Sequence, residues 1–406
     1  MLSTVQLKVR LERTVASLRG DGRGRALVVI ALGWLLILGT RITIPVLLPG
    51  IKTTFDIDNA TAGFTVTVIW AVYGLSQFPA GLLSDRIGDR KVLVASLVVM
   101  TVSVGALAFA PVFIVFLGMA ALVGVGNGLY GPTRGTLLSS LYPENDSTAI
   151  GFTLAVGSLG AAALPVLAGT VVARFGWRSV LAGTVPVFLC ATVLAWRAVP
   201  PTSPTDAAEV PSRSLRGLLA AVSRRPVVLG VGGKTIRVFV FQGLSAFLPT
   251  YLITVKGIDE VTASALFAAL FVSGAVAQIA GGRAVTRYGN RSVLVAIAGA
   301  SALPLLALPF VSGVVPIAIV IVLIGIQLGV TPVTNTYIIN ALPPANRNGA
   351  WGFLRTGYFL VASTGSVFVG VLADAGYFDG ALVVLGGLLI AVAVVFAFLP
   401  ELSESR

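Results

Sequence analysis

The segment Gly81-Leu-Leu-Ser-Asp-Arg-Ile-Gly-Asp-Arg-Lys91 follows a long apolar run and decides the fold, because the chain repeats it. A second copy, Gly282-Arg-Ala-Val-Thr-Arg-Tyr-Gly-Asn-Arg-Ser292, begins 201 residues later and keeps both glycines and two arginines in register. A repeat at about half the chain length indicates a duplicated unit and argues against a solenoid of many short repeats. The sequence therefore predicts two related halves.

Composition indicates which medium surrounds these halves. The chain has 406 residues, of which 56% are hydrophobic and only 11% are charged, and its mean hydropathy is +0.96. Soluble domains carry about 25% charged residues. A chain this apolar belongs in a lipid bilayer, where a helix needs about 20 apolar residues to cross.

Apolar runs divide the chain evenly. We predict an all-α membrane protein with twelve transmembrane helices in two pseudo-symmetric six-helix bundles, at 26–197 and 227–399. Residues 198–226 are rich in Pro, Ser, Thr and charge, as linkers are, and 214–224 could form a short surface helix. The predicted spans are 26–48, 61–83, 92–110, 112–135, 150–172, 179–197, 227–253, 261–284, 292–311, 314–340, 351–373 and 380–399.

Loop charges predict the orientation. With twelve spans, 18 Lys and Arg residues fall on the side of the termini and 4 on the other side. Because positive loops stay inside, both termini, the linker and the tail 400–406 are expected in the cytoplasm of a multi-pass cell-membrane protein. The basic segment 1–25 resembles an amphipathic helix on the inner surface, with a frayed tail as the alternative. Anionic lipid headgroups explain the net charge of +12, and no nucleic-acid partner is expected.

The repeated segment resembles the hallmark loop of the major facilitator superfamily, Gly-x-x-x-Asp-Arg-x-Gly-x-Arg-Arg/Lys between helices two and three. Every position matches here, and the resemblance extends over essentially the whole chain. It implies twelve helices, a cytoplasmic linker and transport, and also that the loop latches the two halves together in the outward-open state. A purely topological positive anchor is the alternative. The predicted gating residues are Gly81, Asp85, Arg86, Gly88, Arg90, Lys91, Arg134 and Arg355.

Each gating residue has a predicted role. Gly81 should let a neighbouring helix approach closely, and Gly88 should allow a turn closed to other residues. Arg134 and Arg355 should pair with Asp85, although contact with a substrate is the alternative for both. Thr286 replaces the aspartate in the second copy, so the latch there should be weaker.

Two arginines lie deep in the membrane. Arg41 lies roughly 22 Å, and Arg237 roughly 15 Å, along their spans from the predicted cytoplasmic end. Lys234 and Arg283 lie close enough to that end for their side chains to reach it. In the family, helices one and seven, which carry the two deep arginines, line a central cavity. Since guanidinium suits carboxylate and phosphate, the pair predicts an anion site, weakly similar to that of the organophosphate exchangers. The alternative is that one of them faces a helix contact and bonds carbonyls.

Acidic residues fall only at loops, linker, termini and span edges, and the chain has no histidine. Proton symport through a titrating group in the cavity is therefore not expected, whereas uniport or anion exchange is. Gly232-Gly-Lys-Thr235 resembles a phosphate-binding loop, but Val228 occupies the position of its first glycine. No enzyme activity, cofactor or metal site is predicted.

Neutral polar residues complete the predicted site. We predict a carrier of a small organic or inorganic anion that works by alternating access, most simply as a monomer. The alternatives are a drug or metabolite efflux antiporter, coupled through carboxylates at the span edges, and a membrane sensor that transports nothing. The predicted substrate-binding residues are Arg41, Tyr73, Arg237, Gln242, Asn335 and Tyr358.

Overall fold

A computed structural model describes residues 23–202, 220–343 and 347–401, and within these ranges the chain is helical with no strand. The first half contains α2 (Arg23–Phe55), α3 (Asn59–Ile87), α4 (Asp89–Ala108), α5 (Phe113–Leu141) and α6 (Asp146–Ala198). The second half contains α8 (Arg225–Thr254), α9 (Glu260–Ala307), α10 (Val314–Gly325), α11 (Val330–Ala341), α12 (Arg347–Ser363), α13 (Gly365–Asp374) and α14 (Phe378–Ala397). Short 3-10 turns, η2 (Leu308–Phe310) and η3 (Ile326–Gly329), follow α9 and join α10 to α11.

The described part of the chain forms 10 helical segments that are long and apolar enough to cross a membrane, and two of them have 51 residues. A helix of that length would be about 76 Å long, far more than a bilayer of about 30 Å requires. Each is broken at one glycine with positive φ, Gly176 in α6 (φ 76°) and Gly289 in α9 (φ 74°). These two segments therefore each cross twice, and the twelve-helix fold is confirmed.

Contacts with α4 show the reversal within α6. Arg178 donates to the carbonyl of Ala110, just beyond the end of α4, at 3.0 Å. Arg90, at the start of α4, donates to the carbonyl of Trp196. The part of α6 after Gly176 thus runs antiparallel to α4. The predicted break near Ala110 is also confirmed, because α4 ends at Ala108 and α5 begins at Phe113.

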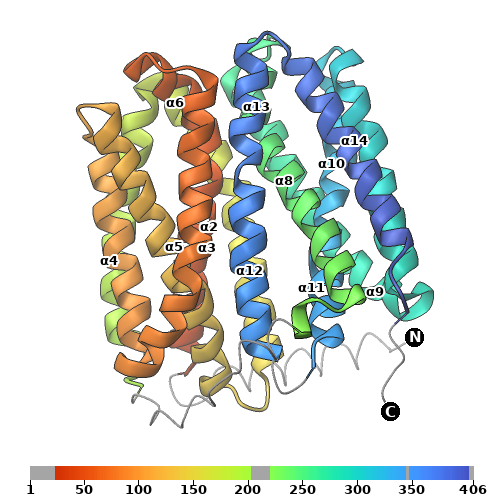
Figure 1. Ribbon diagram of the computed structural model, residues 1–406. Helices are drawn as coiled ribbons and strands as arrows, with labels where there is room; N and C mark the ends of the chain where they lie inside the picture. The colour runs from red at the N-terminus through yellow and green to blue at the C-terminus, as the bar shows by residue number, and fades with distance from the viewer. Residues whose placement is uncertain (1–22, 203–219, 344–346, 402–406) are drawn as a thin grey trace, which may run out of the picture.

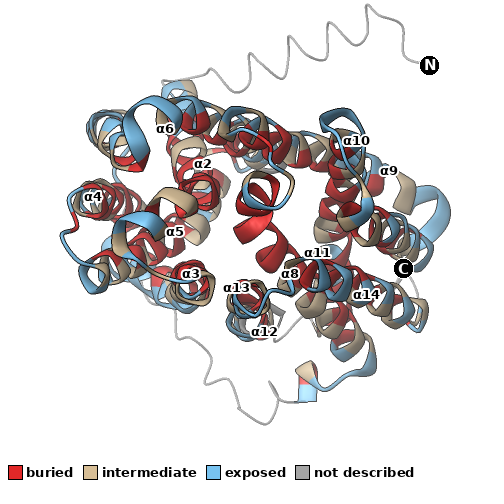
Figure 2. Cartoon of the chain, turned by 90° about the horizontal axis from the view of Figure 1, so that it is seen from above, coloured by how far each residue is buried: buried red, intermediate tan, exposed pale blue. Residues whose placement is uncertain are grey.

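The two halves lie side by side (Figure 1). Seen from above, the buried helix α8 of the second half lies near the middle of the molecule (Figure 2). Their backbones repeat: Asp58 caps the start of α3 through Thr61, and Asp259 caps the start of α9 through Thr262. Residues with positive φ recur in pairs offset by 200 or 201: Asp56 and Gly257, Gly88 and Gly289, and Gly176 and Gly376.

We call the end of the molecule that carries residues 85–91 the motif face, and the end that carries Asp58, Asp259 and Asp374 the far face. In the described chain, every hydrogen bond between the halves joins the stretch of α3 between Asn59 and Gly74 to α12 or α13. This stretch leads from the far face to mid-membrane. The structure is therefore closed on the far face.

Large apolar side chains, among them Phe78, Leu159 and Ile279, are exposed, as expected for helices in contact with lipid. The assignment of the motif face to the cytoplasm stays a prediction. The predicted N-terminal surface helix lies almost wholly outside the described residues, as does most of the linker; residues 220–222, at its end, are helical.

Candidate functional site

A cavity of about 250 Å³ lies between the two halves at mid-membrane. Arg41 on α2 and Trp70 and Tyr73 on α3 line it from the first half, and Lys234 and Arg237 on α8 line it from the second half. No carboxylate is among its lining residues. The remaining lining residues are Leu38, Ile42, Ser158, Ala161, Val238, Phe241, Phe271, Gln278, Leu328, Thr331, Tyr358 and Phe359.

The two deep arginines predicted from the sequence both reach this cavity. Arg41 is 7% exposed, and its guanidinium lies 4.1 Å from the ring centroid of Trp70 and 4.6 Å from that of Tyr73. Arg237 is 3% exposed, and its guanidinium lies 5.4 Å from the ring of Phe241. On each arginine two guanidinium nitrogens are buried without a hydrogen-bond partner, Nε and Nη1 on Arg41 and Nε and Nη2 on Arg237.

Lys234 is a site residue that the sequence reasoning missed. It was expected to extend toward the membrane edge, but it is 2% exposed, and its Nζ donates to the Asn335 side-chain oxygen. The same nitrogen lies 4.5 Å from the ring of Tyr358 and 4.8 Å from that of Trp351. The missed signal was its spacing, since residues three apart share a helix face and Arg237 is three residues later.

Arg134 and Arg355 do not pair with Asp85 in this structure, which is closed on the far face, so the latch expected of the outward-open state stays a prediction. Nη2 of Arg355 donates to the hydroxyl of Tyr73 at 3.3 Å, and the Arg134 guanidinium lies 4.4 Å from the ring of Trp34. Aromatic faces offer these cations partners inside the membrane. Asp85 is exposed on the motif face, and within the described chain it makes no hydrogen bond or ion pair.

The repeated loop has a structural role within its own half. Gly88 has φ 90°, as predicted for this turn, and a Cβ there would lie 2.4 Å from the carbonyl oxygen of Thr202. Arg90 donates to no described residue of the second half. Its backbone N–H donates to Thr202 at 3.1 Å, and its guanidinium lies 4.5 Å from the ring of Trp196. The space around Gly81 is open, with no atom within 4 Å of a Cβ built there, so the close helix approach expected of it is absent here. Arg86 and Lys91 are exposed.

The predicted neutral residues divide into three groups. Tyr73 and Tyr358 line the cavity. Asn335 does not line it, but its side-chain oxygen accepts a hydrogen bond from Lys234, which does. Gln242 does not line it: its side chain is fully buried, and both of its amide atoms lack a partner.

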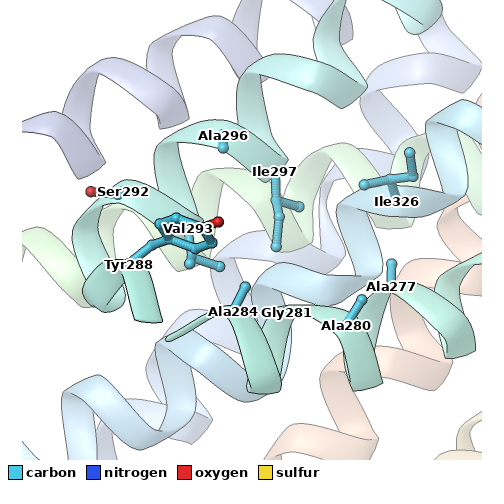
Figure 3. A pocket seen from close by; sticks show the side chains of 10 residues that line it. All are labelled: Ala277, Ala280, Gly281, Ala284, Tyr288, Ser292, Val293, Ala296, Ile297 and Ile326. Atoms are coloured by element: carbon cyan, nitrogen blue, oxygen red, sulfur yellow. The ribbon is translucent and has the colours of Figure 1, made fainter. Parts of the chain in front are cut away.

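A second hollow, of about 410 Å³, lies on α9 beside η3 (Figure 3). It is lined by small and apolar side chains such as Ala280, Ala284 and Val293, with Tyr288 and Ser292 at one end. None of the predicted site residues lines it, and none of its lining residues carries a charge. The candidate site is therefore the cavity between the halves.

The chain is similar to transporters with different substrates. It is 29% identical over 177 residues to the multidrug efflux pump LfrA of Mycolicibacterium smegmatis, covering 43% of this chain and 35% of that protein. It is 26% identical to the 4-hydroxybenzoate transporter PcaK of Pseudomonas putida, covering 61% of this chain and 62% of the relative. With the cis,cis-muconate transport protein of Acinetobacter baylyi it shares 23% identity, covering 87% of this chain and 89% of that protein.

Solved structures show the same fold. A bacterial homolog of the human lysosomal transporter Spinster superposes with a TM-score of 0.81 and 16% identity, covering 94% of this chain and 97% of that chain. The sequence profile of the Major Facilitator Superfamily matches residues 29–330 and 256–406, which together span nearly the whole chain. The chain thus belongs to the Major Facilitator Superfamily, and it is a membrane transporter of small solutes, not an enzyme.

Proposed function

We propose that the protein carries a small organic anion across the cell membrane by alternating access. One observation carries the proposal: Arg41 and Arg237 line one buried cavity that no carboxylate lines, and each has guanidinium nitrogens without a hydrogen-bond partner. Burying a charge without a partner is costly, by several kcal/mol per ion. A carboxylate or phosphate on the ligand would supply the missing acceptors, and guanidinium bonds both groups in bidentate fashion.

The named substrates of two relatives support an organic anion. PcaK is named for 4-hydroxybenzoate, and a relative that aligns over most of both chains is named for cis,cis-muconate. Both names denote carboxylates. The aromatic lining of the cavity suits the hydrocarbon part of such molecules, because flat rings stack well on aromatic side chains.

Efflux of amphipathic compounds is the second candidate, favoured by the similarity to LfrA. The charge of the cavity restricts it. Arg41, Lys234 and Arg237 would repel cationic drugs, because like charges in a low dielectric destabilise one another. An efflux role would therefore concern neutral or anionic compounds.

Substitution of each deep arginine tests the proposal. Uptake of radiolabelled 4-hydroxybenzoate and muconate into proteoliposomes is measured for Arg41→Gln, Arg237→Gln and the control Arg283→Gln, which makes the same change at an exposed position on α9. A hydrogen bond to a charged group contributes about 1.5–3 kcal/mol. We therefore expect both cavity variants to lose about tenfold or more of the uptake efficiency, whereas the control keeps the wild-type rate.

Two results would contradict the anion function. In one, wild-type protein moves neither compound, nor any anion of a wider panel, under any imposed gradient. In the other, transport is intact in both cavity variants, which would mean that the buried guanidinium groups do not contact the substrate.

A further inference from the structure

The positive charges of the cavity form two groups on different halves. Arg41 belongs to the first half and lies over Trp70 and Tyr73. Lys234 and Arg237 belong to α8 in the second half, and Lys234 lies over Tyr358. Each group thus has an aromatic wall of its own.

The two walls are joined by one ring. Phe359 lies between Tyr73 and Tyr358, with ring centroids 5.1 Å and 4.6 Å away. It also stacks on Trp70 at 5.9 Å with an interplanar angle of 16°. The route from Arg41 to Lys234 therefore runs along a continuous aromatic surface, with Phe241 and Phe271 also lining the cavity.

The number of charges exceeds what one carboxylate can compensate. Arg41, Lys234 and Arg237 all line the cavity, and Arg355 donates to the hydroxyl of Tyr73, over whose ring Arg41 lies. The hydrogen-bond partners of Lys234 and Arg355 among the described residues are neutral: Asn335 for the lysine, and Tyr73 and Tyr358 for the arginine. A ligand with a single negative charge would leave buried positive charge uncompensated on one half.

We propose that the preferred substrate is a dianion whose two acidic groups are separated by a flat, unsaturated or aromatic spacer. One acidic group meets Arg41 on the first half, the other meets Lys234 and Arg237 on the second half, and the spacer lies along Phe359. This assignment rests on the anion function proposed above and adds the number and spacing of charges to it. A substrate of this kind links the two halves, since each half holds one end.

Matched ligands test the assignment on the unmodified protein. Binding to purified full-length protein is measured by calorimetry for terephthalate and for 4-carbamoylbenzoate, which has nearly the same shape but only one charge. We expect terephthalate to bind at least tenfold more tightly. The third ligand is trans-cyclohexane-1,4-dicarboxylate, which keeps both charges but lacks the flat ring, and we expect it to bind more weakly than terephthalate.

Variants locate the second acidic group. In Lys234→Met, terephthalate should lose at least tenfold in affinity while 4-carbamoylbenzoate changes less than threefold, so that the preference for the dianion disappears. The control Arg291→Met removes an exposed positive charge from the same half and should leave both affinities unchanged. Melting temperatures without ligand verify that both variants are folded.

The outcomes separate the two proposals. Equal affinity of wild-type protein for terephthalate and 4-carbamoylbenzoate would overturn the dianion assignment and leave the anion function standing. Equal losses for both ligands in Lys234→Met would overturn it as well, because both ligands would then use Lys234 alike. Absence of binding by all three ligands, together with absence of transport of every anion, would overturn the function itself.

Discussion

The two halves of the molecule share their backbone but not their charges. Turn residues with positive φ and aspartate helix caps recur at the same positions in both halves. Some charged residues have no charged counterpart: Gln242 stands in the second half where Arg41 stands in the first, and Thr286 stands opposite Asp85. The duplicated positions determine the turns and helix starts, whereas the positions that differ include charged residues of the cavity and of the repeated loop.

The far face shows the same contrast. Gly370 packs against the carbonyl of Asn59, and its counterpart Gly169 packs against Ser264. At the first of these contacts a carboxylate bonds across the halves, because Asp374 accepts from the backbone N–H groups of Asn59 and Ala60 at 2.9 Å and 2.7 Å; no such bond is found at the second contact among the described residues. A carboxylate at a helix N-terminus is favourable. The closure is thus symmetric in shape and asymmetric in charge.

The largest effect should come from the duplicated turn. Gly88→Ala and Gly289→Ala place a side chain where φ is 90° and 74°, which costs about 1–3 kcal/mol in such a backbone region. At Gly88 the new Cβ would also meet the Thr202 carbonyl oxygen at 2.4 Å, whereas at Gly289 no atom lies within 4 Å. We expect both variants to melt at lower temperature than wild type, and Gly88→Ala to show the greater loss.

Thermal unfolding of the detergent-purified proteins measures this difference. Gly282→Ala is the control, because Gly282 has open space around it and its φ is not positive. Equal losses of melting temperature at the two turns would show that the contact with Thr202 contributes nothing. An unchanged melting temperature in both variants would show that the positive φ of these glycines does not contribute to stability.

The number and arrangement of the helices were predictable from the sequence because they depend on patterns that repeat. Apolar runs of the length of a bilayer and the two copies of the Gly81–Lys91 loop were sufficient to predict twelve helices in two bundles. The turn at Gly88 followed from the same loop. The pattern also separated the spans on either side of Gly176 and of Gly289, and contacts such as Arg178 to Ala110 show the reversal within the first of these 51-residue segments.

The site was only partly predictable because depth along a helix does not give the direction of a side chain. Arg41 and Arg237 were found from depth, but Lys234 was placed at the membrane edge and Gln242 in the cavity. Arg355 was assigned to the latch, since nothing in the sequence shows that Tyr73 lies beside it. These contacts join residues far apart in the chain and depend on how the halves pack.

A smaller effect should follow from removing the charge at the far-face contact. Asp374→Asn keeps an acceptor for α3 but loses the negative charge at its N-terminus. Since Asp374 is exposed, we expect a loss of about 1 kcal/mol, or about a fivefold shift toward the state that is open on the far face. Asp56→Asn is the matched control, because Asp56 is exposed on the same face and its positive φ suits asparagine equally well.

Electron spin resonance measures this shift as a distance distribution between labels at Thr53→Cys and Tyr377→Cys, which lie on different halves, in a Cys190→Ser background. Growth of a longer-distance population in Asp374→Asn alone supports the charged contact. The same distribution in both variants would mean that close packing at Gly370 holds the face shut without the carboxylate.

The smallest effect should come from the duplicated helix caps. Asp58 and Asp259 accept from Thr61 and Thr262 at 2.8 Å and 2.9 Å, and these hydrogen bonds hold the pKa of both carboxyls below the usual value. Because a lowered pKa stabilises the fold only while the carboxylate is ionised, the stabilisation by both caps should be complete at neutral pH and should decrease as the pH falls below about 4.

The start of α3 also has the Asp374 carboxylate, whereas none of the hydrogen bonds at the start of α9 brings a carboxylate from the first half. Asp259→Ala should therefore lower the melting temperature at pH 7 slightly more than Asp58→Ala, and this difference should disappear in an Asp374→Asn background, where α3 no longer has the compensating charge. An unchanged difference in that background would show that Asp374 contributes to the contact between the halves and not to the stability of α3.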